Sequence, residues 1–205
     1  MRVHRKPIDK LMDCQTTKRW TLCNTTLDSN VASHSFNVAV IAMAIFKEMF
    51  HKEGHSERDV CYYAMLHDVD EAETGDIPTP TKLALKNSGV DPSKVLFTQG
   101  LLPEPPEFIA ELVKIADLLE NYVFISEFGV GTRARVATFD TSRRLTDAID
   151  GSSRKDMARA AMAVLDYIKG RYSDTDQERK RIEEDSERMR KTDEFMRTTT
   201  APNVG

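Results

Sequence analysis

Apolar residues recur at intervals of three and four along most of the chain, which is the spacing of one buried face of an α-helix. The clearest stripe joins Val38, Ile41, Ile45 and Met49. Stripes of this kind predict helices over about 5–16, 31–52, 56–68, 106–128, 141–149 and 153–170. No segment alternates apolar and polar residues as a half-buried strand does, so we predict an all-α fold.

Three segments lack such a stripe and are predicted to be loops. Residues 16–30 are rich in threonine and asparagine, and residues 86–106 contain repeated proline and glycine, with at most one helical turn. The segment at 129–140, GVGTRARVATFD, holds a glycine pair with no strand before it. Such a pair is no dinucleotide-binding motif, and we interpret it as a loop.

Length and composition suit one domain followed by a tail. A chain of 205 residues can bury a sizeable core, and we place this domain at 1–172. Residues 173–205 are strongly charged and predicted to be a helix or a tail. Ile182, Met189 and Met196 recur there every seven residues and could contact another subunit, although three positions do not make a coiled coil.

Charge and hydropathy exclude several classes of partner. The net charge of -4 gives no reason to expect a nucleic-acid polymer or an anionic membrane. No apolar run reaches the roughly 18 residues of a membrane span, and the basic N-terminus lacks the apolar segment of a secretory signal. Three cysteines without CxxC spacing indicate reduced thiols, so we expect a cytoplasmic protein.

The stretch at 66–82, LHDVDEAETGDIPTPTK, combines ionisable side chains with a stiff bend. His67 and Asp68 are adjacent, and Glu71 follows on the same face if the helix continues. Gly75 predicts the end of that helix, and the prolines after it predict a rigid bend. A histidine and two carboxylates beside a rigid loop suit the wall of an active site.

Two more ionisable residues, His34 and Asp117, lie on or within apolar helix stripes. Each could be an ordinary hydrogen-bonded or solvent-facing residue. With His67 and Asp68 they form a set of imidazoles and carboxylates that suits Mn²⁺, Fe²⁺, Co²⁺, Ni²⁺ or Zn²⁺, and Mg²⁺ is a further candidate. Such a metal would lower the pKa of a bound water, and Glu71 could move the proton of that water.

Arg19 and Trp20 allow two interpretations. The indole could fill the core while the neighbouring guanidinium lies in solvent. Alternatively, Arg19 holds a phosphate and Trp20 packs on a sugar or a base.

Four segments, in this order, resemble the HD-domain phosphohydrolases and, among them, the branch of the 5′-deoxynucleotidases. The matching segments are KRW at 18–20, NVASHSFNVA at 30–39, LHDVDEAETGDIPTPTK at 66–82 and VKIADLLENYV at 113–123. The resemblance spans about residues 10–127 and implies an HD-domain helical bundle. One departure is Ser33, where many members carry a glutamate before the metal-binding histidine.

The resemblance also implies roles for individual residues. It assigns a divalent metal to two histidines and two aspartates, here His34, His67, Asp68 and Asp117. It assigns the handling of the nucleophilic water to Glu71, and phosphate orientation with crowding of the ribose 2′ position to Arg19 and Trp20. It assigns the nucleoside contact to the loop residues Asp76, Ile77, Pro78 and Thr79.

The substrate implied by the resemblance is a small 2′-deoxynucleotide. In compactness the chain resembles the phage dATP triphosphohydrolases, and Lys82 and Lys114 could neutralise a polyphosphate, although both could be ordinary solvated lysines. The alternatives are a 5′-deoxynucleotidase acting on monophosphates and a non-catalytic nucleotide-binding helical module. Members are commonly oligomeric, so we expect a homo-oligomer, in the host cytoplasm if the protein is encoded by a phage.

Overall fold

The computed structural model describes residues 12–90 and 104–170 of the chain. Its elements are β1 Asn24–Thr25, α2 Val31–Glu48, α3 Glu57–Leu66, α4 Glu71–Thr74, α5 Thr79–Asn87, α7 Glu107–Phe128, β2 Gly129–Val130 and α8 Gly131–Gly151. Residues 155–170 are also helical. Within the described ranges, no helix is both long and apolar enough to cross a bilayer. The prediction of an all-α fold is confirmed.

Some predictions lie outside the described residues. These are most of the first helix at 5–16, the centre of the loop at 86–106 and the domain boundary at 172. The charged segment at 173–205, with its apolar residues at seven-residue spacing, also lies outside. The described residues up to Val164 belong to one compact unit, and the second unit, Leu165–Gly205, is described only as far as residue 170.

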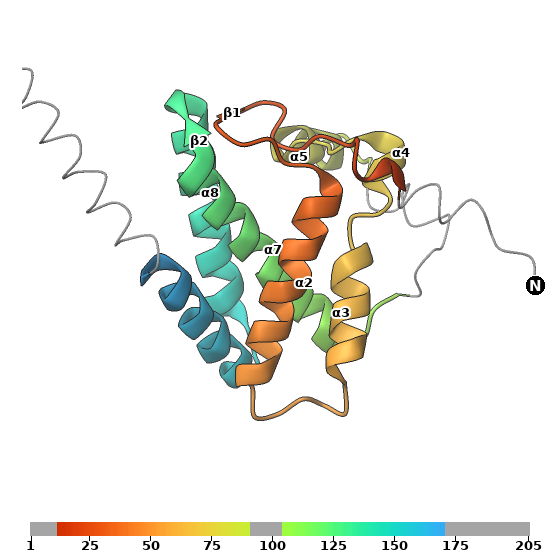
Figure 1. Ribbon diagram of the computed structural model, residues 1–205, viewed down its shortest axis with the longest axis vertical. Coiled ribbons are helices and arrows are strands. Elements are labelled where there is room, and N and C mark those ends of the chain that lie inside the picture. The colour runs from red at the N-terminus through yellow and green to blue at the C-terminus, as the bar shows by residue number, and fades with distance from the viewer. Residues whose placement is uncertain (1–11, 91–103, 171–205) are drawn as a thin grey trace, which may run out of the picture. The chain divides into compact units, whose positions relative to one another are not determined.

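The core lies between α2, α3 and α7 (Figure 1). α2 and α3 run side by side, α7 packs against both, and α8 packs against α7. The predicted stripes of α2 and α7 are buried here, with Val38, Ala42, Ile45, Ile109, Leu112 and Leu119 at 0% exposure. Because these stripes also carry His34 and flank Asp117, burying them brings ionisable groups into the interior.

The start of α2 is fixed by a capping box. Asn30 accepts a hydrogen bond from the Ser33 backbone N–H at 2.8 Å, and the Ser33 hydroxyl accepts one from the Asn30 backbone N–H at 3.3 Å. Side-chain caps of this kind satisfy amide groups that the first turn leaves unpaired. The helix therefore begins with His34 in its first turn, on the buried face.

In the stretch at 66–82, the helix is interrupted where we predicted that it continues. α3 ends at Leu66, and residues 67–70 form a turn before the short helix α4. Gly75 ends α4 with φ of 74°, as predicted. The bend after it is shorter than expected, because Thr79 already begins α5. Pro80 fits there, since the first turn of a helix needs no partner for its backbone N–H.

The prediction of a loop at 129–140 is wrong. Gly129 and Val130 pair antiparallel with Thr25 and Asn24, and α8 then begins at Gly131, whose φ is 84°. A pair of strands with two residues each is too short to show alternation in the sequence. The helix predicted at 141–149 is the last part of the much longer α8.

Gly129 is predicted to be essential for the close approach between α7 and α8. A Cβ atom at this position would lie 2.3 Å from the Ile125 carbonyl oxygen and 2.8 Å from the Ala134 Cβ. We expect Gly129→Ala to lower the free energy of unfolding by about 1–3 kcal/mol through overpacking, as measured by urea denaturation.

Gly151→Ala is the matched control for this substitution. A Cβ atom at Gly151 meets no atom of the described structure within 4 Å. Its unfolding free energy should stay within about 0.5 kcal/mol of the unsubstituted protein. Equal stability of the two variants would contradict the packing described for Gly129.

Candidate metal centre

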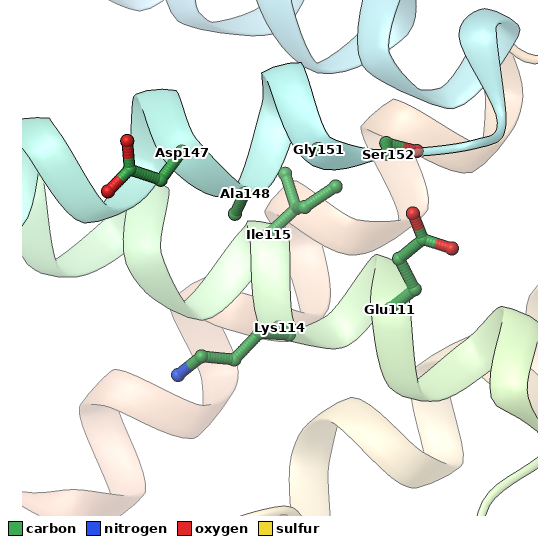
Figure 2. A pocket seen from close by; sticks show the side chains of 7 residues that line it. All are labelled: Glu111, Lys114, Ile115, Asp147, Ala148, Gly151 and Ser152. Atoms are coloured by element: carbon green, nitrogen blue, oxygen red, sulfur yellow. The ribbon is translucent and has the colours of Figure 1, made fainter.

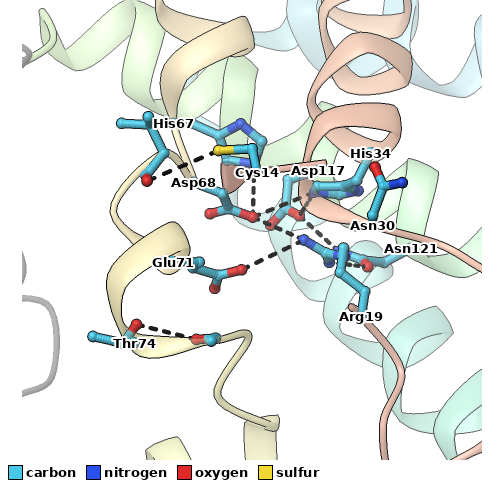
Figure 3. A network of polar contacts seen from close by, with 12 residues as sticks. Cys14, Arg19, Asn30, His34, His67, Asp68, Glu71, Thr74, Asp117 and Asn121 are labelled. Atoms are coloured by element: carbon cyan, nitrogen blue, oxygen red, sulfur yellow. Dashed lines mark hydrogen bonds and ion pairs between the residues drawn. The ribbon is translucent and has the colours of Figure 1, made fainter. Parts of the chain in front are cut away.

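The structure brings the four predicted metal ligands together (Figure 3). His34 comes from the first turn of α2, His67 and Asp68 from the turn that ends α3, and Asp117 from the middle of α7. One ligand atom from each lies within 4.8 Å of all the others. Opposite donors around an ion at about 2.1 Å would be about 4.2 Å apart, so only a small contraction is needed to share one ion.

Both imidazole rings are oriented by their Nδ1 atoms. Nδ1 of His34 lies 2.6 Å from Oε2 of Glu120, and Nδ1 of His67 lies 2.7 Å from the carbonyl oxygen of Ala64. That carbonyl accepts the bond, so the proton of His67 is on Nδ1. It is also one of the last α3 carbonyls, which need partners from outside the helix.

The Nε2 atoms of both rings are consequently directed toward the two aspartates. Both atoms are buried and form no hydrogen bond within the described structure, although aspartate oxygens lie 3.3–3.5 Å away. Buried polar atoms of this kind are rare, and each needs an explanation. A divalent cation between the two Nε2 atoms and the two carboxylates would supply the missing partner, so the residues fit a metal.

The carboxylates of Asp68 and Asp117 are held in their charged form. Burial acts to raise the pKa of Asp68, but His67, His34 and Arg19 hold it well below its usual range. Burial also opposes the charge of Asp117, whereas Lys114 at 2.9 Å and the nearby ring of His34 lower its pKa. Both carboxylates are therefore ionised at neutral pH and available as ligands for a cation.

Protons and a metal compete for the same nitrogen in this cluster. Burial and the charge of Arg19 act to lower the pKa of His34, but the nearby carboxylates of Asp117, Asp68 and Glu120 raise it well above its ordinary value. Metal ligands must be deprotonated, so we expect metal affinity to fall as the pH is lowered.

Glu71 lies one turn after Asp68 and faces the cluster (Figure 3). Its Oε1 accepts a hydrogen bond from Nζ of Lys82 at 3.0 Å, while Oε2 is buried, without a hydrogen bond within the described structure and 3.9 Å from Nη1 of Arg19. Burial, and then the charge of Asp68, raises the pKa of Glu71 to about 7. A carboxyl group with such a pKa can take and return a proton near neutral pH.

Arg19 is buried in the cluster, which excludes the interpretation that places it in solvent. Its side chain is 8% exposed; Nη1 donates to Asp68 at 2.8 Å and Nη2 donates to Oδ1 of Asn121 at 2.8 Å. Its Nε is buried with no partner among the described residues. The guanidinium is thus held in place by two of its five N–H donors.

Trp20 is only half-buried and has an uncommon backbone conformation. Its φ is 58°, in the left-handed region that bulky residues rarely adopt. Its ring stacks on Phe124 with centroids 6.2 Å apart, and its Nε1 is buried without a hydrogen-bond partner in the described structure. Conformations of this kind persist only where the surrounding structure holds them.

The remaining predicted site residues surround the cluster less closely. Asp76, Ile77 and Pro78 are half-buried, and the charge of Asp76 acts on both Arg19 and Glu71. The exposed Thr79 accepts a 3.3 Å hydrogen bond from Arg144 of α8.

Lys82 and Lys114 are the two lysines bonded to cluster carboxylates. Their side chains are 40% and 53% exposed, and they pair with Glu71 and Asp117 respectively. Lys114 also lines a cavity of about 290 Å³ between α7 and α8 (Figure 2). That cavity contains none of the four candidate metal ligands.

Three residues of the network were not predicted from the sequence. Glu120 contacts His34, Asn37 donates to Oε1 of Glu120 at 3.2 Å, and Asn121 donates to Oδ1 of Asp117 at 2.6 Å. Asn121 is four residues after Asp117, a spacing that places both on one helix face and could have indicated the contact. Glu120 could have been noted as a charged residue within an apolar stripe.

Comparisons with known proteins find relatives among deoxynucleotide phosphohydrolases. The family model described as 5′-deoxynucleotidase YfbR-like matches residues 8–88. A dATP triphosphohydrolase of Salmonella phage PMBT28 is 36% identical over 129 residues, which are 59% of this chain and 66% of that protein. The 5′-deoxynucleotidase YfbR of Shigella boydii serotype 18 is 42% identical over 114 residues, 53% of this chain and 56% of that protein.

In sequence, the chain is similar to the HD-domain phosphohydrolases. The resemblance inferred from the four segments is therefore confirmed. This HD-domain protein spans between about half and two thirds of the length of the two curated relatives named above.

A solved structure has the same fold as this HD-domain protein. It is the cyanophage S-2L HD phosphohydrolase DatZ, bound to dA and one catalytic Zn²⁺ ion. The TM-score is 0.62 at 23% identity, and the match covers 79% of this chain and 96% of that one. The HD-domain bundle is thus shared over almost the whole of that protein.

Proposed function

We propose that this protein is a metal-dependent phosphohydrolase of 2′-deoxynucleotides, and that it converts dATP and water to deoxyadenosine and triphosphate. The observation that carries the proposal is the pair of buried, unpartnered Nε2 atoms of His34 and His67 beside two ionised aspartates. The phage relative named dATP triphosphohydrolase supports the choice of substrate.

The proposed reaction breaks the bond between the α-phosphorus and the 5′ oxygen. A divalent cation held by His34, His67, Asp68 and Asp117 would polarise the phosphate and lower the pKa of a water molecule. Glu71 takes a proton from the attacking water through Oε2, which has no hydrogen bond among the described residues. The same carboxyl group can return that proton to the departing 5′ oxygen.

Three basic residues are proposed to hold the phosphates. Arg19 is already fixed by Asp68 and Asn121, so little side-chain entropy is lost when one of its remaining N–H groups donates to a phosphate oxygen. Lys82 and Lys114 are partly exposed at the cluster and can neutralise the charge of the β- and γ-phosphates. These contacts would favour a triphosphate over a monophosphate.

The nucleoside is proposed to lie between Trp20 and the segment after α4. Trp20 would pack against the deoxyribose at its 2′ position, where a hydroxyl group would be crowded. Asp76 can accept a hydrogen bond from the 3′-OH, and Ile77, Pro78 and Thr79 would contact the base.

The second candidate function is a 5′-deoxynucleotidase, which the Shigella relative favours. It would release orthophosphate from dAMP and leave dATP intact. A non-catalytic nucleotide-binding module remains the alternative from another class, but Glu71 would have no purpose there.

Analysis of the phosphorus products tests these alternatives. The protein is incubated with Co²⁺ and either dATP or dAMP, and ³¹P NMR identifies what is released. We expect triphosphate from dATP and little turnover of dAMP or ATP. Orthophosphate from dAMP alone would support the nucleotidase, and nucleotide binding without any product would support the binding module.

Two further properties belong to the proposal. We propose that the protein acts as a homo-oligomer on a small-molecule substrate, and that it works in the cytoplasm, that of the host if a phage encodes it. Light scattering of the purified protein tests the first of these properties.

A further inference from the structure

We propose that Glu120 is a positioning residue that orients His34 and strengthens it as a metal ligand. This inference rests on the proposed metal site. The Oε2 atom of Glu120 lies 2.6 Å from Nδ1 of His34, so Nε2 on the opposite side of the ring is directed toward Asp68 and Asp117. The contact joins α7 to α2 across 86 positions of sequence.

Glu120 is deeply buried and has no permanent cation beside it. It is 4% exposed and His34 is 0% exposed. Its other oxygen accepts a hydrogen bond from the neutral amide of Asn37, and no lysine or arginine of the described residues forms an ion pair with it. A buried carboxylate is costly without a compensating charge. A cation on the far side of the His34 ring would supply that charge through the imidazole.

The residue before His34 cannot perform this role. Ser33 is exposed, and its hydroxyl bonds to the backbone of Asn30 at 3.0 and 3.3 Å. His67 is oriented differently, by the neutral carbonyl oxygen of Ala64. A carboxylate on the distal nitrogen raises the basicity of an imidazole ligand more than a carbonyl oxygen does. The structure therefore assigns His34 as the stronger donor of the two rings.

Titration with Co²⁺ tests the assignment without depending on turnover. The visible absorption of bound Co²⁺ reports both affinity and the ligands around the ion. We expect Glu120→Gln, which keeps the shape but loses the charge, to weaken Co²⁺ binding about 10-fold. Glu120→Ala should weaken it toward about 100-fold, the range found when partners of ligating histidines are removed. Both variants should alter the absorption spectrum.

Ser33→Ala is the control for a merely structural effect. It removes one half of the α2 capping box and leaves every cluster side chain in place. It should lower thermal stability while leaving the Co²⁺ affinity within about twofold of the unsubstituted protein, because the orienting partner of His34 is unchanged.

The outcomes separate this inference from the proposed function. If the unsubstituted protein binds no Co²⁺, the metal site itself is wrong, and the inference falls with it. If that protein binds Co²⁺ and Glu120→Gln binds it equally well with the same spectrum, only the role of Glu120 is overturned. Glu120→Gln decides the question even where Glu120→Ala does not fold.

Discussion

His67→Ala should abolish tight binding of a divalent metal and lower kcat/KM for dATP by about 10³-fold or more. A metal contributes several kcal/mol of transition-state stabilisation, and each 1.4 kcal/mol is a factor of ten in rate. His67 is the most informative of the four ligands to remove. Its Nδ1 bonds only to the backbone carbonyl of Ala64, so its loss leaves the ion pairs of Arg19 and Lys114 intact.

His51→Ala is the matched control, because it removes an imidazole outside the cluster. The His51 side chain is 88% exposed, and its ring faces Asp156 at 3.5 Å. Metal affinity, measured by titration, and dATP turnover should both stay as they are in the unsubstituted protein. If His67→Ala kept full metal affinity and full dATP turnover, His67 could not be a metal ligand.

Glu71→Gln should lower kcat by about 10²–10⁴-fold while metal and dATP binding persist, which is the size of effect expected for general acid–base catalysis. The amide keeps the shape of the side chain and can still pair with solvent or Lys82, but it cannot take a proton. Single-turnover kinetics with dATP, together with Co²⁺ titration, separate the chemical step from binding. Glu73→Gln, on an exposed position of the same short helix, should change neither quantity.

The pH dependence gives a second measure of Glu71. A base must be deprotonated to act, so kcat/KM should fall as the pH drops through the pKa of this carboxyl group. Burial, and then Asp68, raises that pKa to about 7. A bound cation would lower this pKa. The acid limb of the profile of kcat/KM against pH should therefore lie at or below pH 7. The limb assigned to Glu71 should disappear in Glu71→Gln, and undiminished kcat in that variant would remove Glu71 from the mechanism.

Much of the fold follows from periodicity in the sequence. α2 and α7 were predictable because each buries a long stripe, and burial on one face of a helix leaves a clear period. The same stripes contain His34 and flank Asp117, so their approach in space follows from packing the two helices together. β1 and β2 pair over only two residues each, and no local sequence pattern predicts so short a pairing.

The supporting residues of the site were less predictable, for a physical reason. Glu120 meets His34 across 86 positions, and only the packing of α7 on α2 brings them together. Arg19 lies in a segment of irregular structure, where no period shows which way a side chain points. Its burial beside Asp68 therefore required the structure.

Anomalous diffraction from crystals grown with Zn²⁺ most directly tests whether one cation is shared by these four side chains. We predict a single peak between His34, His67, Asp68 and Asp117, about 2.0–2.2 Å from one nitrogen or oxygen of each. Both histidines should bind through Nε2, with Nδ1 still on Glu120 and Ala64. A peak elsewhere, or none in crystals of protein that hydrolyses dATP, would contradict the proposed metal centre.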